Sequence, residues 1–393
     1  MDRLVARRPD AFQKAGIDVR VHHRVERINL ERRELEVVDL DHHQVMAEHF
    51  DTLVIATGAL PVVPEVPGVD ADRIFTVKSL EGAQSLRRAL SERPDARVVV
   101  VGGGYIGLEM ADNLRRSGRP VVLVDRNPAL MSSLDTDMGE LVTRAAEALG
   151  VTLALEETLV GFETDGRAVT AAVTDRNRHA ADIVILGLGV VPDSDLSAEA
   201  GIPLGAGGAI HVDDQCRTGA LGVFAAGDCA DVYDVVARRH VYQPLATHAN
   251  KQGRVAGLAI AGRPARFPGV TGTAITQLGE TEVARAGLGE KEVRALSLDA
   301  AASAISSTTR VPYMPGTGPI RVKLWGERGS GRLLGGQIVG GPGSGKRIDV
   351  VATALMAGLT VDDLLGLDLA YAPGVSDTWD PVQVAARTLI RDL

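Results

Sequence analysis

A glycine-rich turn between two apolar runs holds the residues whose types and spacing are best suited to chemistry. Gly102, Gly104 and Gly107 follow the run "RVVVV" in the order Gly-x-Gly-x-x-Gly, and Asp125 ends the next run, "PVVLVD". The first glycine permits a tight turn, the second lets a pyrophosphate approach the backbone, and the third lets helix and strand pack closely. Free N–H groups at the helix start attract phosphate. The context predicts a dinucleotide site, against the alternative of a glycine-rich turn in an ordinary α/β domain.

The predicted dinucleotide is NADH. An acid at the position of Asp125 can accept ribose hydroxyls and would repel a 2′-phosphate, whereas the neighbouring Arg126 leaves NADPH as a second candidate. The residues assigned to this site from the sequence are Gly102, Gly104, Ile106, Gly107, Asp125, Arg126 and Gly189.

An internal repeat indicates a second nucleotide fold. "FDTLVIATGALPVVP" (50–64) and "ADIVILGLGVVPDSD" (181–195) each place a glycine seven residues after an aspartate and a proline three residues after that glycine. In the second copy, the glycine (Gly189) lies 82 positions after Gly107 (189 − 107), and the same interval before Gly58 falls upstream of Met1. We therefore expect the first fold to lack its opening βαβ unit, and residues 1–97 to contain the remainder of that fold.

Two further stretches suit a flavin. "GVFAAGDCADVYD" ends an apolar run with Gly227 and Asp228, where an aspartate can bind a cofactor polyol or, in the alternative reading, start a turn. A helix predicted from about Leu245 has a positive N-terminal end, which suits the flavin N1–C2 edge that becomes anionic on reduction. The residues assigned to this cofactor are Ala56, Thr57, Gly58, Gly227, Asp228, Leu245, Ala246 and Thr247.

The chain is long enough for several domains, and its texture changes along its length. Val/Ile-rich runs alternate with helical stretches over residues 50–260, which is typical of an α/β fold, whereas strand-like pieces followed by helices after residue 268 indicate an α+β unit. Residues 61–72 are proline-rich and form a candidate connector, and residues 21–43 are expected to form a solvated hairpin.

Charge and cysteine content exclude several classes of protein. A net charge of −9 with a pI near 5.5 argues against nucleic acid as a partner. The sequence contains no apolar run of the roughly 18–20 residues needed to cross a bilayer. Two cysteines are too few for a disulfide framework and favour the reducing cytoplasm.

Seven motifs of the chain, taken in order, resemble those of the FAD-dependent pyridine nucleotide–disulfide oxidoreductases. They are "VIATG", "VVGGGYIGLEMADNL", "ILGLGVVPD", "FAAGDCA", "NKQGRVAG", "KRIDVVATAL" and "DLAYAPGVSDTWDPV". The closest resemblance is to the coenzyme A-disulfide reductase, NADH oxidase and NADH peroxidase group. It implies two Rossmann-like dinucleotide-binding domains, the first incomplete at its N-terminus, and a C-terminal α+β dimerisation domain. It also implies a homodimer with FAD and NADH as cofactors. The expected parts are residues 1–76 (first FAD segment), 77–194 (NAD(P)H domain), 195–266 (second FAD segment) and 267–393 (dimerisation).

The same resemblance implies roles for four more residues. Tyr105 would gate the nicotinamide pocket, and Glu109 would face the flavin domain beside it. Tyr313 in "VPYMPG" and Tyr371 in "LAYAPG" match tyrosines presented to the partner subunit's substrate pocket, where a phenol can orient a thiol or give it a proton. The alternative for each is a packed tyrosine whose hydroxyl is satisfied by backbone. Gly374 replaces the usual second proline of the "YAPP" motif.

The group's redox cysteine has no counterpart in this sequence, because no cysteine precedes Cys216. Cys229 follows Asp228 and is expected to be buried, and Cys216 is expected in a connecting loop. The absence of both this cysteine and the FAD fingerprint indicates a truncated chain or an internal start. The expected function is a coenzyme A-disulfide or persulfide reductase; the alternatives are a cysteine-free NADH oxidase or diaphorase, which would reduce oxygen or dyes, and an inactive NADH-binding dimer.

Two other patterns are assigned no site. "GGPGSGKR" (340–347) satisfies G-x4-G-K, but Arg347 stands where a phosphate-binding P-loop needs Ser or Thr. The nine histidines show no metal-ligand spacing, so surface or packing roles are expected and no metal is predicted.

Overall fold

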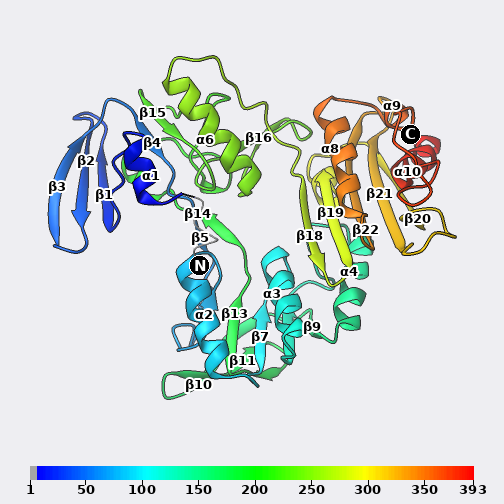
Figure 1. Ribbon diagram of the computed structural model, residues 1–393, viewed down its shortest axis with the longest axis horizontal. Coiled ribbons are helices and arrows are strands. Elements are labelled where there is room, and N and C mark those ends of the chain that lie inside the picture. The colour runs from blue at the N-terminus through cyan, green and yellow to red at the C-terminus, as the bar shows by residue number, and fades with distance from the viewer. Residues whose placement is uncertain (1–6) are drawn as a thin grey trace. The chain divides into compact units, whose positions relative to one another are not determined.

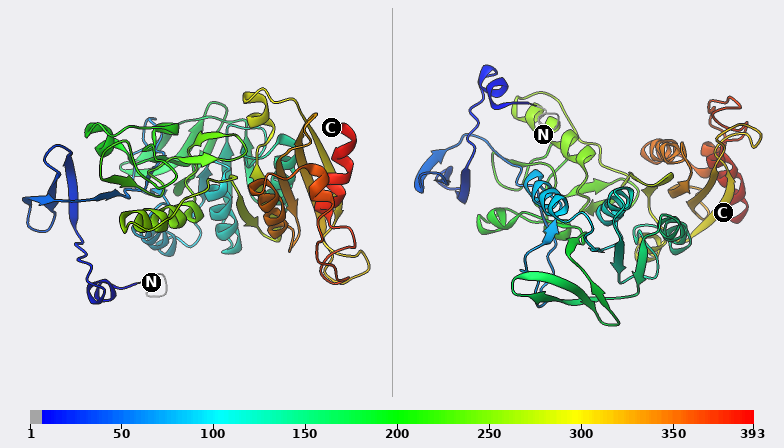
Figure 2. Two further views of the ribbon diagram at one scale, coloured as in Figure 1. Left: turned by 90° about the horizontal axis from the view of Figure 1, so that it is seen from above. Right: turned by 60° about the horizontal axis from the view of Figure 1, so that its bottom comes forward.

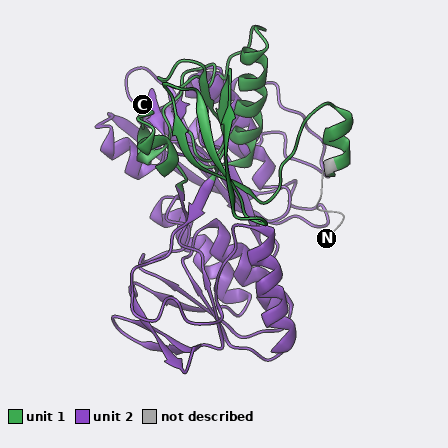
Figure 3. Ribbon diagram, turned by 90° about the vertical axis from the view of Figure 1, so that its left-hand side faces the viewer, with its two compact units in different colours: residues 1–58, 192–231, 244–267 green, residues 59–191, 232–243, 268–393 purple. Residues whose placement is uncertain are grey.

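The computed structural model describes residues 7–393, which form two compact units (Figure 3). Unit 1 contains the described residues up to 58 together with 192–231 and 244–267; unit 2 contains 59–191, 232–243 and 268–393. The division into four domains stays a prediction, because unit 2 groups most of the predicted NAD(P)H and dimerisation parts together.

Unit 1 combines a small antiparallel sheet with a short parallel pair. Its elements, labelled as in Figure 1, are α1 (Pro9–Lys14), β1 (His23–Asn29), β2 (Glu34–Asp39), β3 (Gln44–His49), β4 (Leu53–Ile55), α5 (Asp195–Glu199), η2 (Ala206–Gly208), β15 (Val223–Ala225) and α6 (Ala246–Ile260). The predicted hairpin is confirmed as β1 and β2, and β3 extends it to three strands. β4 pairs in parallel with β15, and its Ile55 is buried with Ile210 and Val223 in the core of this unit.

The first part of unit 2, residues 59–191, is built on a five-stranded parallel sheet in the order β6-β13-β7-β8-β9. Its elements, with β14 ending one residue beyond it, are β5 (Ala59–Pro61), β6 (Ile74–Thr76), α2 (Leu80–Glu92), β7 (Val98–Val101), α3 (Tyr105–Arg116), β8 (Val121–Asp125), α4 (Thr136–Ala148), β9 (Thr152–Leu155), β10 (Leu159–Asp165), β11 (Ala168–Thr174), β12 (Arg178–Ala180), β13 (Ile183–Leu186) and β14 (Val190–Pro192). The apolar runs on either side of the glycine turn form β7 and β8, and the apolar run of the second repeat copy forms β13.

Both faces of this parallel sheet are covered, which explains why its central strands β7 and β13 are apolar throughout. Side chains alternate along a strand, so Val98 and Val100 pack under α2, α3 and α4, while Val99 and Val101 pack against residues of β10 and β11. Figure 2 shows β10 and β11 as a long hairpin.

The second part of unit 2 is an antiparallel sheet in the order β18-β19-β22-β21-β20. With the short connecting pair, its elements are β16 (Val232–Asp234), β17 (Arg239–Val241), β18 (Ala274–Leu278), β19 (Thr281–Gly287), α7 (Glu290–Ala295), β20 (Ala300–Thr308), β21 (Pro319–Glu327), β22 (Leu333–Gly340), η3 (Gly345–Arg347), α8 (Ile348–Met356), α9 (Val361–Leu365), α10 (Pro381–Leu389) and η4 (Ile390–Asp392). One face of the sheet packs on α8, α9 and α10. On the other face, Leu278, Val283 and Val339 share a core with α4.

The two copies of the repeat have the same local structure. Gly58 and Gly189 both adopt positive φ, +82° and +93°, between an apolar strand and a three-residue strand that ends at the repeated proline. Within the copies, β4 corresponds to β13 and β5 to β14, and β5 and β14 pair with each other. Among the described residues, no helix is both long and apolar enough to cross a membrane.

Candidate functional site

The glycine turn before α3 has the packing that its spacing predicts. A Cβ on Gly107 would lie 1.8 Å from the carbonyl oxygen of Gly102, and one on Gly102, whose φ is +105°, would lie 2.5 Å from that of Gly187. At Gly104, the N-cap of α3, a Cβ would meet nothing within 4 Å. Two glycines are therefore required by the fold, whereas Gly104 keeps the helix start open to a ligand.

Asp125, at the end of β8, is held in this turn by its own hydrogen bonds. Its Oδ2 accepts the N–H of Gly103 at 2.6 Å, and its Oδ1 accepts the backbone and side-chain N–H groups of Asn127, each at 2.8 Å. The carboxylate thus links β8 to the loop that would receive the dinucleotide. Arg126 is exposed beside it, and Gly189 is exposed after β13.

The start of α3 presents the backbone N–H groups that suit a pyrophosphate. The first N–H groups of a helix have no intrahelical partner, and Tyr105 and Ile106 occupy its first turn. Burial raises the pKa of the Tyr105 phenol, while the charge of Arg285 acts in the opposite direction. Further along α3, the carboxylate of Glu109 accepts a hydrogen bond from the Thr276 hydroxyl at 3.0 Å. The gating role of Tyr105 and the flavin-facing role of Glu109 stay predictions.

The residues assigned to a flavin all belong to unit 1 (Figure 3). Gly227, with φ +90°, donates its N–H to Oε1 of the buried Gln252 at 2.9 Å. The Nε2 of Gln252 donates to the carbonyl of Asp231 at 3.1 Å, so one side chain of α6 fixes the loop that contains Asp228. Sequence reasoning missed Gln252, which had appeared only as a letter in "NKQGRVAG".

The N-terminal end of α6 and the end of β4 contain most of the residues predicted to bind the flavin. Leu245 caps α6 without a side-chain hydrogen bond, and the next two residues, Ala246 and Thr247, are exposed. Ala56 and Thr57 are exposed and border an apolar hollow of about 230 Å³. This hollow is lined by Val25, Ile28, Leu35, Leu53, Val54, Ile55, Ala56, Thr57 and Leu196. Pockets for drug-sized ligands occupy roughly 300–1,000 Å³, so the hollow could hold only part of a dinucleotide.

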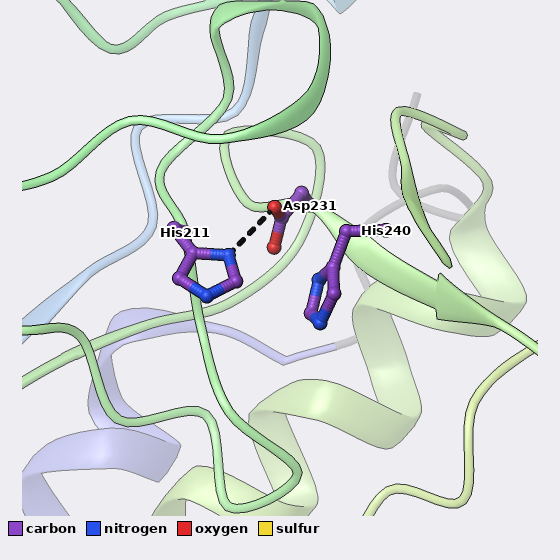
Figure 4. Close-up of side chains that lie close together, drawn as sticks. All are labelled: His211, Asp231 and His240. Atoms are coloured by element: carbon purple, nitrogen blue, oxygen red, sulfur yellow. Dashed lines mark hydrogen bonds and ion pairs between the residues drawn. The ribbon is translucent and has the colours of Figure 1, made fainter. Parts of the chain in front are cut away.

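A buried aspartate orders the loop that follows η2. The side chain of Asp231 is fully buried, and its carboxylate lies 3.0 Å from Nδ1 of His211 and accepts the N–H of Val212 at 3.2 Å (Figure 4). These bonds connect the segments on either side of β15. The surface or packing role expected for the histidines stays a prediction.

Both cysteines are buried, as expected for Cys229. Burial raises the pKa of the Cys216 thiol to about 12. Its Sγ lies 3.4 Å from the carbonyl of Gln252, and Cys229 Sγ lies 3.5 Å from that of Ile55. Neither thiol has the exposure of a redox cysteine, and the pKa of the Cys216 thiol is raised rather than lowered.

We therefore expect the native protein to react with fewer than about one thiol equivalent of Ellman's reagent at pH 8, because the reacting species is the thiolate. The same protein unfolded in guanidinium should release two equivalents, one per cysteine. Rapid reaction of a native thiol would contradict the burial of both cysteines. The variant Cys216→Ser would identify which cysteine had reacted.

The backbone N–H groups of the P-loop-like stretch (residues 340–347) bind the carboxylate of a side chain from the same protein, Glu282. The N–H groups of Gly343 and Gly345 donate to Glu282 on β19, at 3.1 and 2.6 Å, where a P-loop would bind phosphate. Lys346 pairs with Asp349, and the side chain of Arg347 is largely buried. The prediction that this stretch does not bind phosphate stays untested, but its N–H groups are already used.

The two predicted tyrosines lie on neighbouring loops of the antiparallel-sheet part. Tyr313 is 76% exposed and Tyr371 is 50% exposed. A Cβ on Gly374 would lie 3.4 Å from the methyl carbon of Met314, so the two loops are in contact. The exposure of both phenols leaves them accessible to a partner or substrate.

Comparison with known proteins identifies the class. The pyridine nucleotide-disulphide oxidoreductase family model matches residues 3–253, and the dimerisation-domain model of the same family matches residues 273–382. The chain belongs to the pyridine nucleotide-disulphide oxidoreductases, which confirms the resemblance found in the sequence.

Individual relatives agree with this family. The chain is 36% identical over 398 residues to the NAD(P)H coenzyme A polysulfide/persulfide reductase of Pyrococcus horikoshii, covering 99% of this chain and 86% of that protein. It is 31% identical to an NADH oxidase of Methanocaldococcus jannaschii, covering 100% and 87%. The structure of an NAD-dependent persulfide reductase from A. fulgidus superposes with a TM-score of 0.94 at 34% identity, covering 98% of this chain and 71% of that one.

Proposed function

We propose that the protein is an FAD-dependent NAD(P)H oxidoreductase of the coenzyme A-disulfide or persulfide reductase type. The observation that carries this proposal is the intact glycine turn before α3, in a chain whose relatives include a coenzyme A persulfide reductase. The balanced reaction consumes NADH, a proton and a disulfide or persulfide and yields NAD⁺ and two thiols, one of them hydrogen sulfide where the substrate is a persulfide.

The chain's own residues would bind and orient the two cofactors. The N-terminus of α3 would hold the NADH pyrophosphate beside Gly104, and Asp125 would hold the adenine-side ribose. The positive end of α6, with Thr57 and Asp228, would hold the flavin and its polyol. Bound FAD would supply the hydride-accepting and electron-transfer chemistry.

The acceptor side is assigned to Tyr313 and Tyr371 of a partner subunit. The matched dimerisation domain and the exposure of both phenols support a homodimer in which these tyrosines orient a thiol-linked acceptor or protonate it. We expect the enzyme to act in the cytoplasm, where its two cysteines would remain reduced.

The decisive experiment measures the flavin absorption spectrum and determines which acceptor reoxidises the flavin after reduction by NADH. The purified protein, supplied with FAD, should show a flavin spectrum that NADH bleaches under anaerobic conditions and that coenzyme A disulfide restores. Restoration by oxygen or a dye alone would support the cysteine-free oxidase or diaphorase instead. Protein that binds NADH but retains no flavin would overturn the proposal in favour of an inactive dimer.

A further inference from the structure

Arg347, at the end of the P-loop-like stretch, uses four hydrogen bonds to join separate backbone segments. Its Nη2 donates to the carbonyls of Thr309 and Val375, at 2.7 and 3.3 Å. Its Nε donates to Asp380 at 2.9 Å, and its Nη1 donates to the carbonyl of Gly343. Arg347 and Asp380 are each only 12% exposed at the side chain, so this ion pair is largely buried.

The segments that Arg347 joins carry the two exposed tyrosines. Thr309 begins the loop of residues 309–318, which contains Tyr313, and Val375 lies in the loop of residues 366–380, which contains Tyr371. One guanidinium nitrogen bridges these two loops directly. The pairing of Nε with Asp380 adds the N-cap of α10, since Oδ1 of Asp380 accepts the N–H of Val382 at 2.9 Å.

The planar fork of arginine is needed for this arrangement. A guanidinium has five donors in fixed directions, whereas a lysine ammonium is a point charge that cannot span the same carbonyls. Exposed loops would otherwise retain considerable conformational freedom, and ordering them separately costs entropy. Because the largely buried side chain of Arg347 bonds to both loops, the position of the Tyr313 loop depends on the position of the Tyr371 loop.

We propose that Arg347 is a positioning residue that ties the Tyr313 loop to the Tyr371 loop, so that both phenols reach one acceptor at once. The identity of the acceptor in this inference rests on the proposed function, whereas the link between the loops rests only on the hydrogen bonds of Arg347. Its consequence is that loss of the fork should loosen both loops together and weaken acceptor binding without affecting the reaction of NADH.

The first test uses hydrogen exchange of the whole protein, read by mass spectrometry. Arg347→Lys keeps a charge for Asp380 but loses the bridge, and should speed exchange in both loops by about tenfold, the equivalent of one lost hydrogen bond. Lys346→Gln changes the adjacent exposed residue and should leave both loops unaltered. Unchanged exchange in either loop would overturn the proposal. A rise shared equally by β21 and β22 would also overturn it, because Arg347 would then be a general support of the sheet.

The second test separates this inference from the proposed function. With coenzyme A disulfide as acceptor, Arg347→Lys should raise KM about tenfold, while kcat with a dye acceptor stays within about twofold of wild type. Tyr313→Phe and Tyr371→Phe serve as references. If they change acceptor kinetics and Arg347→Lys does not, the positioning role is wrong. If neither tyrosine variant changes the acceptor kinetics, the proposed acceptor site is wrong. The hydrogen-exchange experiment then tests by itself whether Arg347 links the two loops.

Discussion

Replacing Gly107 with alanine is expected to abolish measurable NADH binding and to destabilise unit 2. The added Cβ would lie 1.8 Å from the Gly102 carbonyl oxygen, a backbone atom that no rotamer change can move away. Overpacking of this kind costs about 1–3 kcal/mol or more, although alanine gains up to about 1 kcal/mol in helix propensity. If α3 moves away from β7, the backbone N–H groups at the N-terminus of α3 also move away from the pyrophosphate position. Calorimetric titration with NADH and thermal unfolding measure the two effects.

Gly104→Ala is the matched control for this prediction. Its Cβ would meet nothing within 4 Å, so the melting temperature should stay close to that of the wild type. The methyl group would nevertheless stand where the pyrophosphate approaches, and NADH affinity should fall by at least about tenfold. Normal NADH binding by Gly107→Ala would contradict the assigned site, and unfolding of Gly104→Ala would contradict the open geometry of the helix start.

Asp135→Asn is expected to be the most destabilising of the polar substitutions tested. Asp135 is the N-cap of α4 and the centre of a buried network that joins the start of this helix to β21, β22 and the start of α7. Its carboxylate lies 2.8 Å from Nζ of Lys323 and accepts the Trp325 indole N–H at 2.8 Å. The backbone N–H of Glu290 and the amide of Gln337 also donate to it, each at 2.8 Å. Removing one charge from a buried pair costs about 3–5 kcal/mol, and urea unfolding followed by Trp fluorescence measures the loss.

The pH dependence of this loss follows from the pKa of Asp135. Burial alone would raise that pKa, but hydrogen bonds from one backbone N–H and three side chains outweigh burial and hold it below 3.8. The carboxylate therefore stabilises the native state above pH 3.8 and loses this contribution as the pH falls through the lower native pKa. The stability gap between wild type and Asp135→Asn should narrow in acid. A gap that widens there would contradict the assignment.

Asp137→Asn provides the control for the network. Asp137 also pairs with Lys323, at 2.7 Å, but its side chain is 46% exposed. Exposed ion pairs contribute at most about 1 kcal/mol, so the loss should be several-fold smaller than for Asp135. Equal losses in the two variants would show that burial of the carboxylate is not what matters.

Each structural feature that could be predicted from the sequence depends on residues close together in the chain. Local spacing was enough to indicate the glycine turn, the apolar runs that form β7 and β8, and the N-terminal end of α6. The repeat was also visible, because its aspartate, glycine and proline recur in one frame. Family resemblance then extended these local patterns to the whole chain.

The features that the sequence missed depend on contacts between distant residues. β20 is rich in alanine and serine and has no strong apolar alternation, and it is specified by its pairing with β21. Asp135 meets Gln337 across about two hundred residues, and nothing near either position indicates the pair. Arg347 was noted only as the residue that breaks a P-loop, whereas its side chain joins two loops.

The composition of unit 1 has a consequence for how the protein is made. Its core joins Ile28 and Ile55 to Ile210 and Val223, and α6 follows later still. A ribosome must therefore add residues 59–267 after the first segment has emerged, which takes about 10–40 s at roughly 5–20 residues per second. Throughout synthesis of that stretch, the apolar residues of β4 lack the later members of their core, Ile210 and Val223, so the nascent chain should depend on chaperones until α6 has left the exit tunnel.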